Sequence, residues 1–154
     1  MKNIVYVLES DTARFGAVEL QDGSSIAPIY DLIGSRLIEM IRFDDMHSLF
    51  VDEEALRDGL TAFTIFDGYP KPLAGKIVLV GGDGGQPYRP PLITIADAAA
   101  RFQCCRPVLD PVFATAGDMT PKGLIVAGAL ANLQVRIDRR SPVLEESDDR
   151  GLIQ

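Results

Sequence analysis

The stretch Ser35–Gly59, SRLIEMIRFDDMHSLFVDEEALRDG, decides how this chain is expected to fold. It predicts an alternating strand over 36–43, a polar turn, a short strand Leu49–Val51 and a helix that Asp52 begins as N-cap. Glu39 falls on the odd-numbered face of the first strand, which is otherwise apolar. Because an isolated buried carboxylate is costly, we expect Glu39 to find a hydrogen-bond donor or to lie at the sheet edge.

Segments on both sides of this stretch predict further strands and short helices. We expect a hairpin within 4–27, a helix that begins at Pro28 and ends at Gly34, a buried strand Lys76–Val80, and a helix over 95–102 that Thr94 and Asp97 cap. Loop-like sequence separates them. The predicted fold class is therefore α+β, a mostly antiparallel or mixed sheet with a few short helices packed on it.

An almost wholly apolar segment lies in the last third of the chain. Residues 122–133 predict a helix that is either buried or part of a subunit interface, so a homodimer through this segment is one hypothesis. A strand over 124–126 is the alternative, because that part is rich in aliphatic residues. A final strand is expected at 134–138.

Charge is distributed unevenly along the 154 residues. The net charge is −7, divided into −8 over residues 1–70, +4 over 71–140 and −3 over 141–154. An acidic chain repels nucleic acid. Its uneven charge would suit a basic protein surface or head-to-tail self-association, while solubility alone is the simpler interpretation. We expect one α+β domain over 1–140 and a mobile acidic tail over 141–154.

The two cysteines, Cys104 and Cys105, are neighbours in the sequence. Adjacent cysteines form neither a disulfide framework nor a CxxC motif, so reduced thiols in the cytoplasm are expected. No apolar stretch reaches the roughly 18–20 residues of a membrane span. We therefore expect a cytoplasmic protein with no membrane partner.

The glycine-rich run after Lys76–Val80 is the best small-ligand candidate. It lacks the spacing of a Walker loop or of a dinucleotide fingerprint, so a plain loop is the simpler interpretation. Backbone N–H groups, a ring for stacking and a cation would nevertheless suit a nucleotide-like molecule. The candidate ligand-binding residues are Gly82, Asp83, Gly84, Tyr88 and Arg89.

The acids of the opening stretch, together with the lone histidine, form the second candidate. Asp44, Asp45 and His47 are competent metal ligands, but they number three at most and have no partner cluster, so we expect a solvated turn without metal or cofactor. An acidic docking surface for a basic partner is the better interpretation. Its candidate residues are Glu39, Asp44, Asp45, His47, Glu53 and Glu54.

Catalysis has little support in the sequence. Cys104 or Cys105 with His47 would be the only cysteine–histidine pair, and the two members lie in different predicted elements. No carboxylate pair has a recognisable acid–base setting. We expect no catalytic residues, and a small hydrolase-type enzyme is the weakest alternative.

Four segments follow one another in the chain: IYDLIGSRLIEMIRF, LFVDEEALRDGL, LAGKIVLVGGDG and PLITIADAAARF. In this order they resemble the phage- and plasmid-borne family catalogued as domain of unknown function 3846. The matching positions over about residues 26–102 are Gly34, Ile38-Glu39, Val51 to Glu54, and Gly75 to Gly81. The resemblance implies a mobile-element accessory protein without a known active site. Combined with the charge pattern, it predicts non-enzymatic binding of a host protein through the acidic surface, in a setting that suits an anti-defence role.

Overall fold

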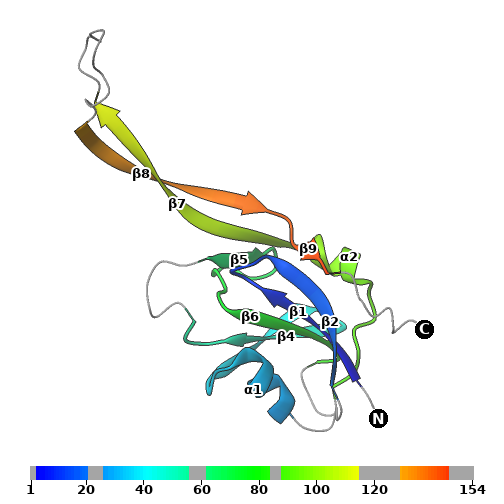
Figure 1. Ribbon diagram of the computed structural model, residues 1–154. Helices are drawn as coiled ribbons and strands as arrows, with labels where there is room; N and C mark the ends of the chain where they lie inside the picture. The colour runs from blue at the N-terminus through cyan, green and yellow to red at the C-terminus, as the bar shows by residue number, and fades with distance from the viewer. Residues whose placement is uncertain (1–2, 21–25, 56–61, 84–87, 115–128, 146–154) are drawn as a thin grey trace. The chain divides into compact units, whose positions relative to one another are not determined.

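The computed structural model describes residues 3–20, 26–55, 62–83, 88–114 and 129–145 (Figure 1). These residues are predominantly β, with two short helices. The expected antiparallel or mixed sheet with a few short helices is confirmed, whereas the class α+β is corrected to predominantly β. They fall into two compact units, residues 1–106 with 139–154, and residues 107–138. The elements are β1 (Asn3–Glu9), β2 (Arg14–Leu20), α1 (Ala27–Ile33), β3 (Ile38–Asp44), β4 (His47–Asp52), β5 (Phe63–Phe66), β6 (Lys76–Gly81), α2 (Ile95–Ala99), β7 (Phe102–Ala114), β8 (Ala129–Arg140) and β9 (Val143–Leu144).

A six-stranded sheet with the order β3-β4-β6-β1-β2-β9 forms the first unit. Its strands pair antiparallel except for β2 and β9, which are parallel. The predicted strand KIVLV becomes β6, and every residue from Ile77 to Gly81 is buried. A continuous apolar run fits this position, because β6 has hydrogen-bonded neighbours on both sides and packed layers on both faces.

Helix α1 covers one face of this sheet (Figure 1). Ile29 and Ile33 of the helix pack with Phe50, Val78 and other buried side chains of the sheet. Gly34 ends the helix in the left-handed region at φ 79°, as the sequence predicts, because glycine has no Cβ to oppose that conformation.

A second layer, made of β5, the start of β7 and α2, covers the opposite face. Phe43 of the sheet stacks on Phe66 of β5 with ring centroids 5.1 Å apart. Phe102 lies 5.5 Å from Phe66 and 5.8 Å from Phe15 of β2. These aromatic contacts tie the two layers together.

The predicted cap of α2 is confirmed, although the helix is shorter than expected. Thr94 accepts a hydrogen bond from the Asp97 N–H at 3.1 Å. The helix ends at Ala99, and Phe102 already belongs to β7.

The two strands predicted for the opening stretch are present as β3 and β4, and they pair as an antiparallel hairpin. Ile38 pairs with Asp52 and Asp44 with His47, with a bulge between Arg42 and Asp44. Strand β3 is an edge strand of the described sheet, and Glu39 there is exposed. The energetic cost expected for a buried carboxylate therefore does not arise for Glu39.

Three predictions of secondary structure differ from what the structure shows. Residues 53–55 form a turn after Asp52, and the rest of the predicted helix lies outside the described residues. The predicted helix over 122–133 is wrong for 129–133, which begin β8, while 115–128 lie outside the description. Val143 and Leu144, expected in a tail, form β9 beside β2.

The second unit contains most of the β7–β8 hairpin, whose strands run in opposite directions (Figure 1). Arg136 Nε of β8 donates to Asp110 Oδ2 of β7 at 2.7 Å, so these two side chains lie on the same face of the hairpin. Among the residues that the structure describes, no helix has the length and apolar character needed to cross a membrane.

Gly81 is a position where a side chain cannot be accommodated without movement. Its N–H donates to the Arg89 carbonyl at 2.6 Å, and a Cβ there would lie 2.3 Å from the Pro90 carbonyl oxygen. We predict that Gly81→Ala lowers the free energy of unfolding by about 1–3 kcal/mol, because the end of β6 and the segment at Arg89–Pro90 must move apart. Urea denaturation measures this.

The matched control is Gly16→Ala, also in a strand. The atoms nearest to a Cβ there belong to the side chain of Glu145, which is about half exposed and is able to move. A smaller loss is expected at Gly16. Equal losses in the two variants would contradict the proposed clash at Gly81.

Candidate functional site

Two adjoining clefts on the first unit form the candidate site. Both contain Asp52, Ala55 and Ala74. The first cleft has a volume of about 620 Å³ and its charged lining residues are Glu9, Asp11, Arg36, Asp52, Glu54 and Lys76. The second has a volume of about 440 Å³ and its charged lining residues are Glu39, Asp52, Glu53 and Lys71.

Strand order brings the lining residues of the first cleft together. Glu9 at the end of β1 pairs with Lys76 at the start of β6. The Ser10 N–H donates to the Gly75 carbonyl at 3.2 Å, which holds the next turn beside β6. Because β4 also pairs with β6, the end of β4 at Asp52 reaches the same region.

Asp52 organises the turn that the two clefts share. Its Oδ1 accepts the Glu54 N–H at 2.9 Å, and its carbonyl oxygen accepts the Ala55 N–H at 3.3 Å. The Glu53 N–H donates to the Leu37 carbonyl at 2.9 Å, which fixes this turn to the segment before β3. Glu53 itself is exposed, so its carboxylate faces solvent beside the cleft.

Glu39 and Tyr69 face one another on the wall of the second cleft. The Tyr69 hydroxyl donates to Glu39 Oε2 at 3.3 Å, which supplies the donor that the sequence required. Burial and the neighbouring Glu39 carboxylate raise the pKa of Tyr69, so its hydroxyl keeps its proton at neutral pH. The pair therefore presents a carboxylate next to an aromatic ring.

The combined charge of the two clefts is negative. Six carboxylates and three cations line them, a net charge of −3. The carboxylates belong to Glu9, Asp11, Glu39, Asp52, Glu53 and Glu54. A site of this kind attracts a cationic group and repels an anionic one such as a nucleotide phosphate.

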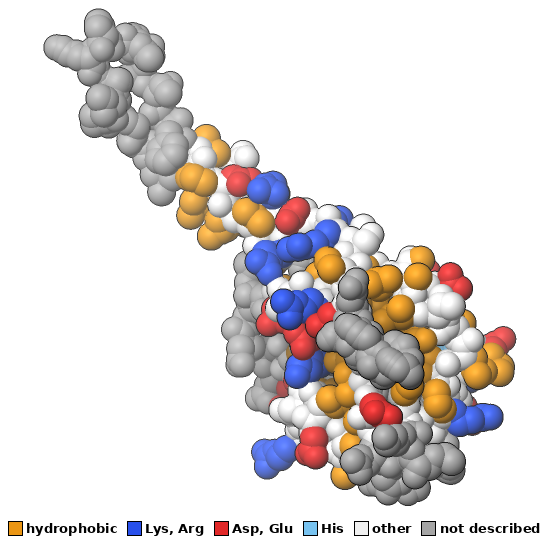
Figure 2. Space-filling view, turned by 45° about the vertical axis from the view of Figure 1, so that its right-hand side comes forward, with side chains coloured by type: hydrophobic (Ala, Val, Ile, Leu, Met, Phe, Trp, Pro, Cys, Tyr) orange, Lys and Arg blue, Asp and Glu red, His pale blue; other side chains and the backbone are white. Residues whose placement is uncertain are grey.

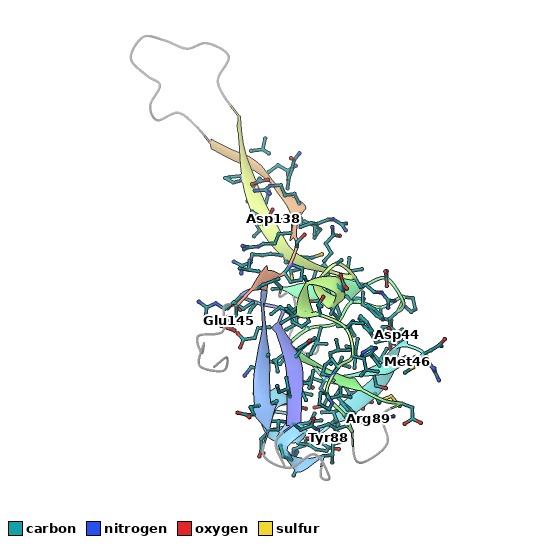
Figure 3. The ribbon with its side chains drawn as sticks, turned by 90° about the vertical axis from the view of Figure 1, so that its right-hand side faces the viewer. Asp44, Met46, Tyr88, Arg89, Asp138 and Glu145 are labelled. Atoms are coloured by element: carbon teal, nitrogen blue, oxygen red, sulfur yellow. The ribbon has the colours of Figure 1, made fainter. Side chains whose placement is uncertain are left out.

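Asp44 and His47 pair at the other end of the β3–β4 hairpin. Asp44 is labelled in Figure 3. Asp44 is five residues from Glu39, a separation of roughly 16 Å along an extended strand. His47 is buried, its Nδ1 lies 2.8 Å from Asp44 Oδ1, and its Nε2 accepts the Leu92 N–H at 2.9 Å. Both ring nitrogens have partners, so this histidine links the turn to the segment around Leu92.

The ionised form of Asp44 is stabilised by its neighbours. Partial burial raises the pKa of its carboxyl, but hydrogen bonds from His47 and from the Met46 N–H outweigh burial and leave the pKa below its ordinary value. Arg101 Nη1 lies 4.0 Å from Asp44 Oδ2. The described residues hold no group of three or more histidine, cysteine or acidic side chains arranged for a metal ion.

Arg101 is a structural residue that sequence patterns did not single out. Its guanidinium bonds Asp67 Oδ1 through Nε at 3.0 Å and Nη2 at 2.8 Å, and donates through Nη1 to the Phe43 carbonyl at 3.1 Å. The same group lies over the rings of Phe43 and Phe66 at 4.3 and 4.9 Å. It therefore covers the aromatic layer from the solvent side.

The glycine-rich loop is already engaged by the protein itself. The Gly81 N–H donates to the Arg89 carbonyl, and the Gly82 N–H to the Met46 carbonyl at 2.8 Å. The Tyr88 ring is buried in the core beneath α1, whereas Arg89 is exposed (Figure 3). Asp83 is exposed too, and Gly84 lies outside the described residues. Tyr88 is thus a core residue that does not offer a face for stacking a base.

The two cysteines are buried free thiols in β7. Burial raises the pKa of Cys104 and, likewise, that of Cys105. A raised pKa keeps a thiol protonated at neutral pH and lowers its nucleophilicity.

The structure thus separates the predicted docking residues into two groups. Glu39, Glu53 and Glu54 line the clefts, while Asp44, Asp45 and His47 are at the opposite end of the hairpin. Sequence reasoning missed the other lining carboxylates: Glu9, Asp11 and Asp52. Glu9 and Asp11 carry no local signal, because only the position of β1 beside β6 brings them to the site.

Removing the Asp44 side chain leaves Nδ1 of the buried His47 ring without its hydrogen-bond partner. We predict that Asp44→Ala lowers the free energy of unfolding by about 1–3 kcal/mol, the cost of leaving a buried donor unpaired. Asp45→Ala is the matched control, since the Asp45 side chain is 98% exposed and its contact with Arg42 is 3.8 Å long. That control is expected to change stability by less than about 0.5 kcal/mol, and a similar loss in both variants would contradict the role of Asp44.

The lowered pKa of Asp44 also predicts a dependence of stability on pH. A carboxyl whose pKa is lower in the folded chain contributes stability above its unfolded pKa of about 3.9, and this contribution is lost as the pH falls through the folded value. We predict that the stability difference between the wild type and Asp44→Asn shrinks between pH 5 and pH 3. Urea denaturation at each pH measures it, and a constant difference would refute the prediction.

Comparisons with known proteins find one matching family and matching rhizobial relatives. The sequence profile of the family described as domain of unknown function 3846 matches residues 1–94, which confirms the resemblance seen in the sequence. The chain is 61% identical to "Uncharacterized protein y4iR" of Sinorhizobium fredii, over 94% of this chain and 89% of the relative. It is 74% identical to "Protein PsiB" of Rhizobium leguminosarum bv. phaseoli, over 84% of this chain and 97% of the relative. No solved structure matches.

Proposed function

This chain belongs to the family described as domain of unknown function 3846, and from its surface we propose that it is a non-enzymatic protein that binds a basic segment of a partner protein. The supporting observation is the pair of adjoining clefts with six carboxylates and three cations. We set this binding in the cytoplasm, where two buried free thiols stay reduced. A phage or mobile-element origin and a host partner complete the proposal.

The arrangement of the carboxylates favours an extended ligand with several cations. Glu9 and Glu54 belong to the first cleft, Glu39 and Glu53 to the second, and Asp52 to both. One lysine or arginine would neutralise only one cleft, whereas successive basic side chains of a peptide would reach both. Surface ion pairs are individually weak, so several acting together are needed for measurable affinity.

Tyr69 gives the second cleft a feature that a purely electrostatic surface lacks. Its hydroxyl bonds Glu39, and its ring is half-buried against the core. An aromatic ring beside a carboxylate suits arginine, which combines a planar cation with an apolar stem. The proposal therefore favours arginine over lysine in the segment that enters this cleft.

The other candidate functions have weaker support. The ring of Tyr88 is buried, and the Gly81 and Gly82 N–H groups donate to backbone carbonyls, which leaves less of the glycine-rich loop for a nucleotide. The negative clefts disfavour a phosphate as well. For an enzyme, Cys104 and Cys105 have raised pKa values and are poor nucleophiles. Binding of a basic segment is accordingly the function we favour.

Neutralising the second cleft tests the proposal. We predict that Glu39→Gln with Glu53→Gln weakens binding of a fluorescent arginine-rich peptide about 2- to 30-fold, since each exposed ion pair contributes roughly 0.2–1 kcal/mol. Fluorescence anisotropy at low and high salt provides the measurement, and added salt is expected to weaken the wild type most.

The control removes the same charge elsewhere. Asp31→Asn with Asp45→Asn alters two exposed carboxylates that line neither cleft. We expect this double variant to bind like the wild type. If both double variants lose the same affinity, net charge alone governs binding and the cleft proposal fails. If the wild type does not bind the peptide at low salt, the proposal fails outright.

A further inference from the structure

The β7–β8 hairpin of the second unit carries a row of exposed aliphatic side chains. Leu133, Val135 and Ile137 alternate along β8 and are 50%, 59% and 38% exposed. Leu109 of β7 is 55% exposed. Five of the twelve large hydrophobic residues that are exposed in the described chain belong to this hairpin, and Figure 2 shows hydrophobic side chains along it. This concentration distinguishes the hairpin from the scattered apolar residues of an ordinary surface.

One hydrogen bond shows which side chains share a face. Arg136 and Asp110 bond at 2.7 Å, so the even-numbered positions of the two strands lie on one face there. Successive side chains of a strand point to opposite faces. Leu109 therefore shares the other face with Leu133, Val135 and Ile137. Pro111 has the same parity, so within residues 107–138 the described positions of this second face carry no charged residue. Arg139 follows at the end of β8, where it donates to Gln103 Oε1 at 3.1 Å.

A two-stranded ribbon of this kind needs a covering surface. Isolated hairpins are at best marginally stable in water, and independent stability requires more strands or packing on an apolar face. Strand β5 pairs with β7 only over Phe102 to Cys105, before the hairpin enters the second unit. Within the described residues, the hairpin beyond Arg106 thus has two strands and an uncovered apolar face.

We propose that this apolar face binds the same face of a second copy of the chain. An uncharged aliphatic surface offers nothing to a basic or acidic partner, whereas an identical surface complements it in hydropathy. The chain's net charge of −7 would oppose most contacts between copies, but the face itself is uncharged, so repulsion there is least. This interface is independent of the acidic clefts, which lie in the other unit.

The size of the face determines how tight the dimer is. Eight residues of an extended strand span about 26 Å and paired strands lie about 5 Å apart, so a two-stranded face is small. A standard stable interface buries about 800 Å² per partner. We therefore expect a reversible dimer that dissociates on dilution. The two faces would stack like the sheets of a sandwich, about 10 Å apart, with Val135 near the two-fold axis.

Placing a charge on each face of β8 tests this inference. Val135→Asp puts a carboxylate in the middle of the apolar face, and Gln134→Asp puts the same carboxylate on the opposite face of the neighbouring residue. Sedimentation equilibrium of the full chain is measured from low to high micromolar concentration. The expected result is a concentration-dependent dimer for the wild type and Gln134→Asp, and at least a tenfold weaker dimer for Val135→Asp.

Cysteine crosslinking provides a second readout that does not depend on a buried charge. Val135→Cys is expected to form a covalent dimer with a short bifunctional maleimide, and Gln134→Cys to form much less. Cys104 and Cys105 are buried, so the wild type is the background. A monomeric wild type over the whole concentration range would overturn the inference, since the face would then be covered within one chain. Equal crosslinking at both positions, or equal dimer loss in both aspartate variants, would also overturn it.

Discussion

Burial of β6 on both faces is the constraint on which the first unit depends. Every residue from Ile77 to Gly81 is buried, so hydrogen-bonded strands must flank β6 and apolar layers must cover both faces. Strands β4 and β1 take the flanking positions, and each belongs to a hairpin. The ends of these strands meet at one end of β6, and this meeting places Glu9, Asp52 and Lys76 around a common cleft. The clefts thus follow from the packing of the core.

Local signals in the sequence predicted local structure well. Gly34 ends a helix, Thr94 caps another, and the alternating stretch around Glu39 forms a hairpin. Each of these depends on interactions within a few residues, which a single sequence displays. Glu39 also shows how a conflict in a pattern can be informative, because a carboxylate on an apolar strand face pointed correctly to an edge strand with a donor nearby.

Long-range features were beyond such reasoning. Glu9 and Asp11 reach the cleft only through the pairing of β1 with β6, and that strand order leaves no mark on their neighbours in the sequence. Residues 129–133, ALANL, are good helix formers, so their intrinsic preference concealed the alternation that continues through Ile137. The sequence analysis expected a sheet with a few short helices, but it underestimated how far strands predominate. One further reason is β5, which lies in a segment without a strong local signal.

After the β7–β8 hairpin, the chain returns to the six-stranded sheet at β9. The family match ends at residue 94, before β7 begins, and Val143 rejoins the sheet by donating its N–H to the Ala13 carbonyl at 2.7 Å. The segment between Arg106 and Arg139 is therefore tethered at both ends to one body. Because both ends of this segment are held by the first unit, a change in the length of the hairpin would leave the strand order of that unit unchanged.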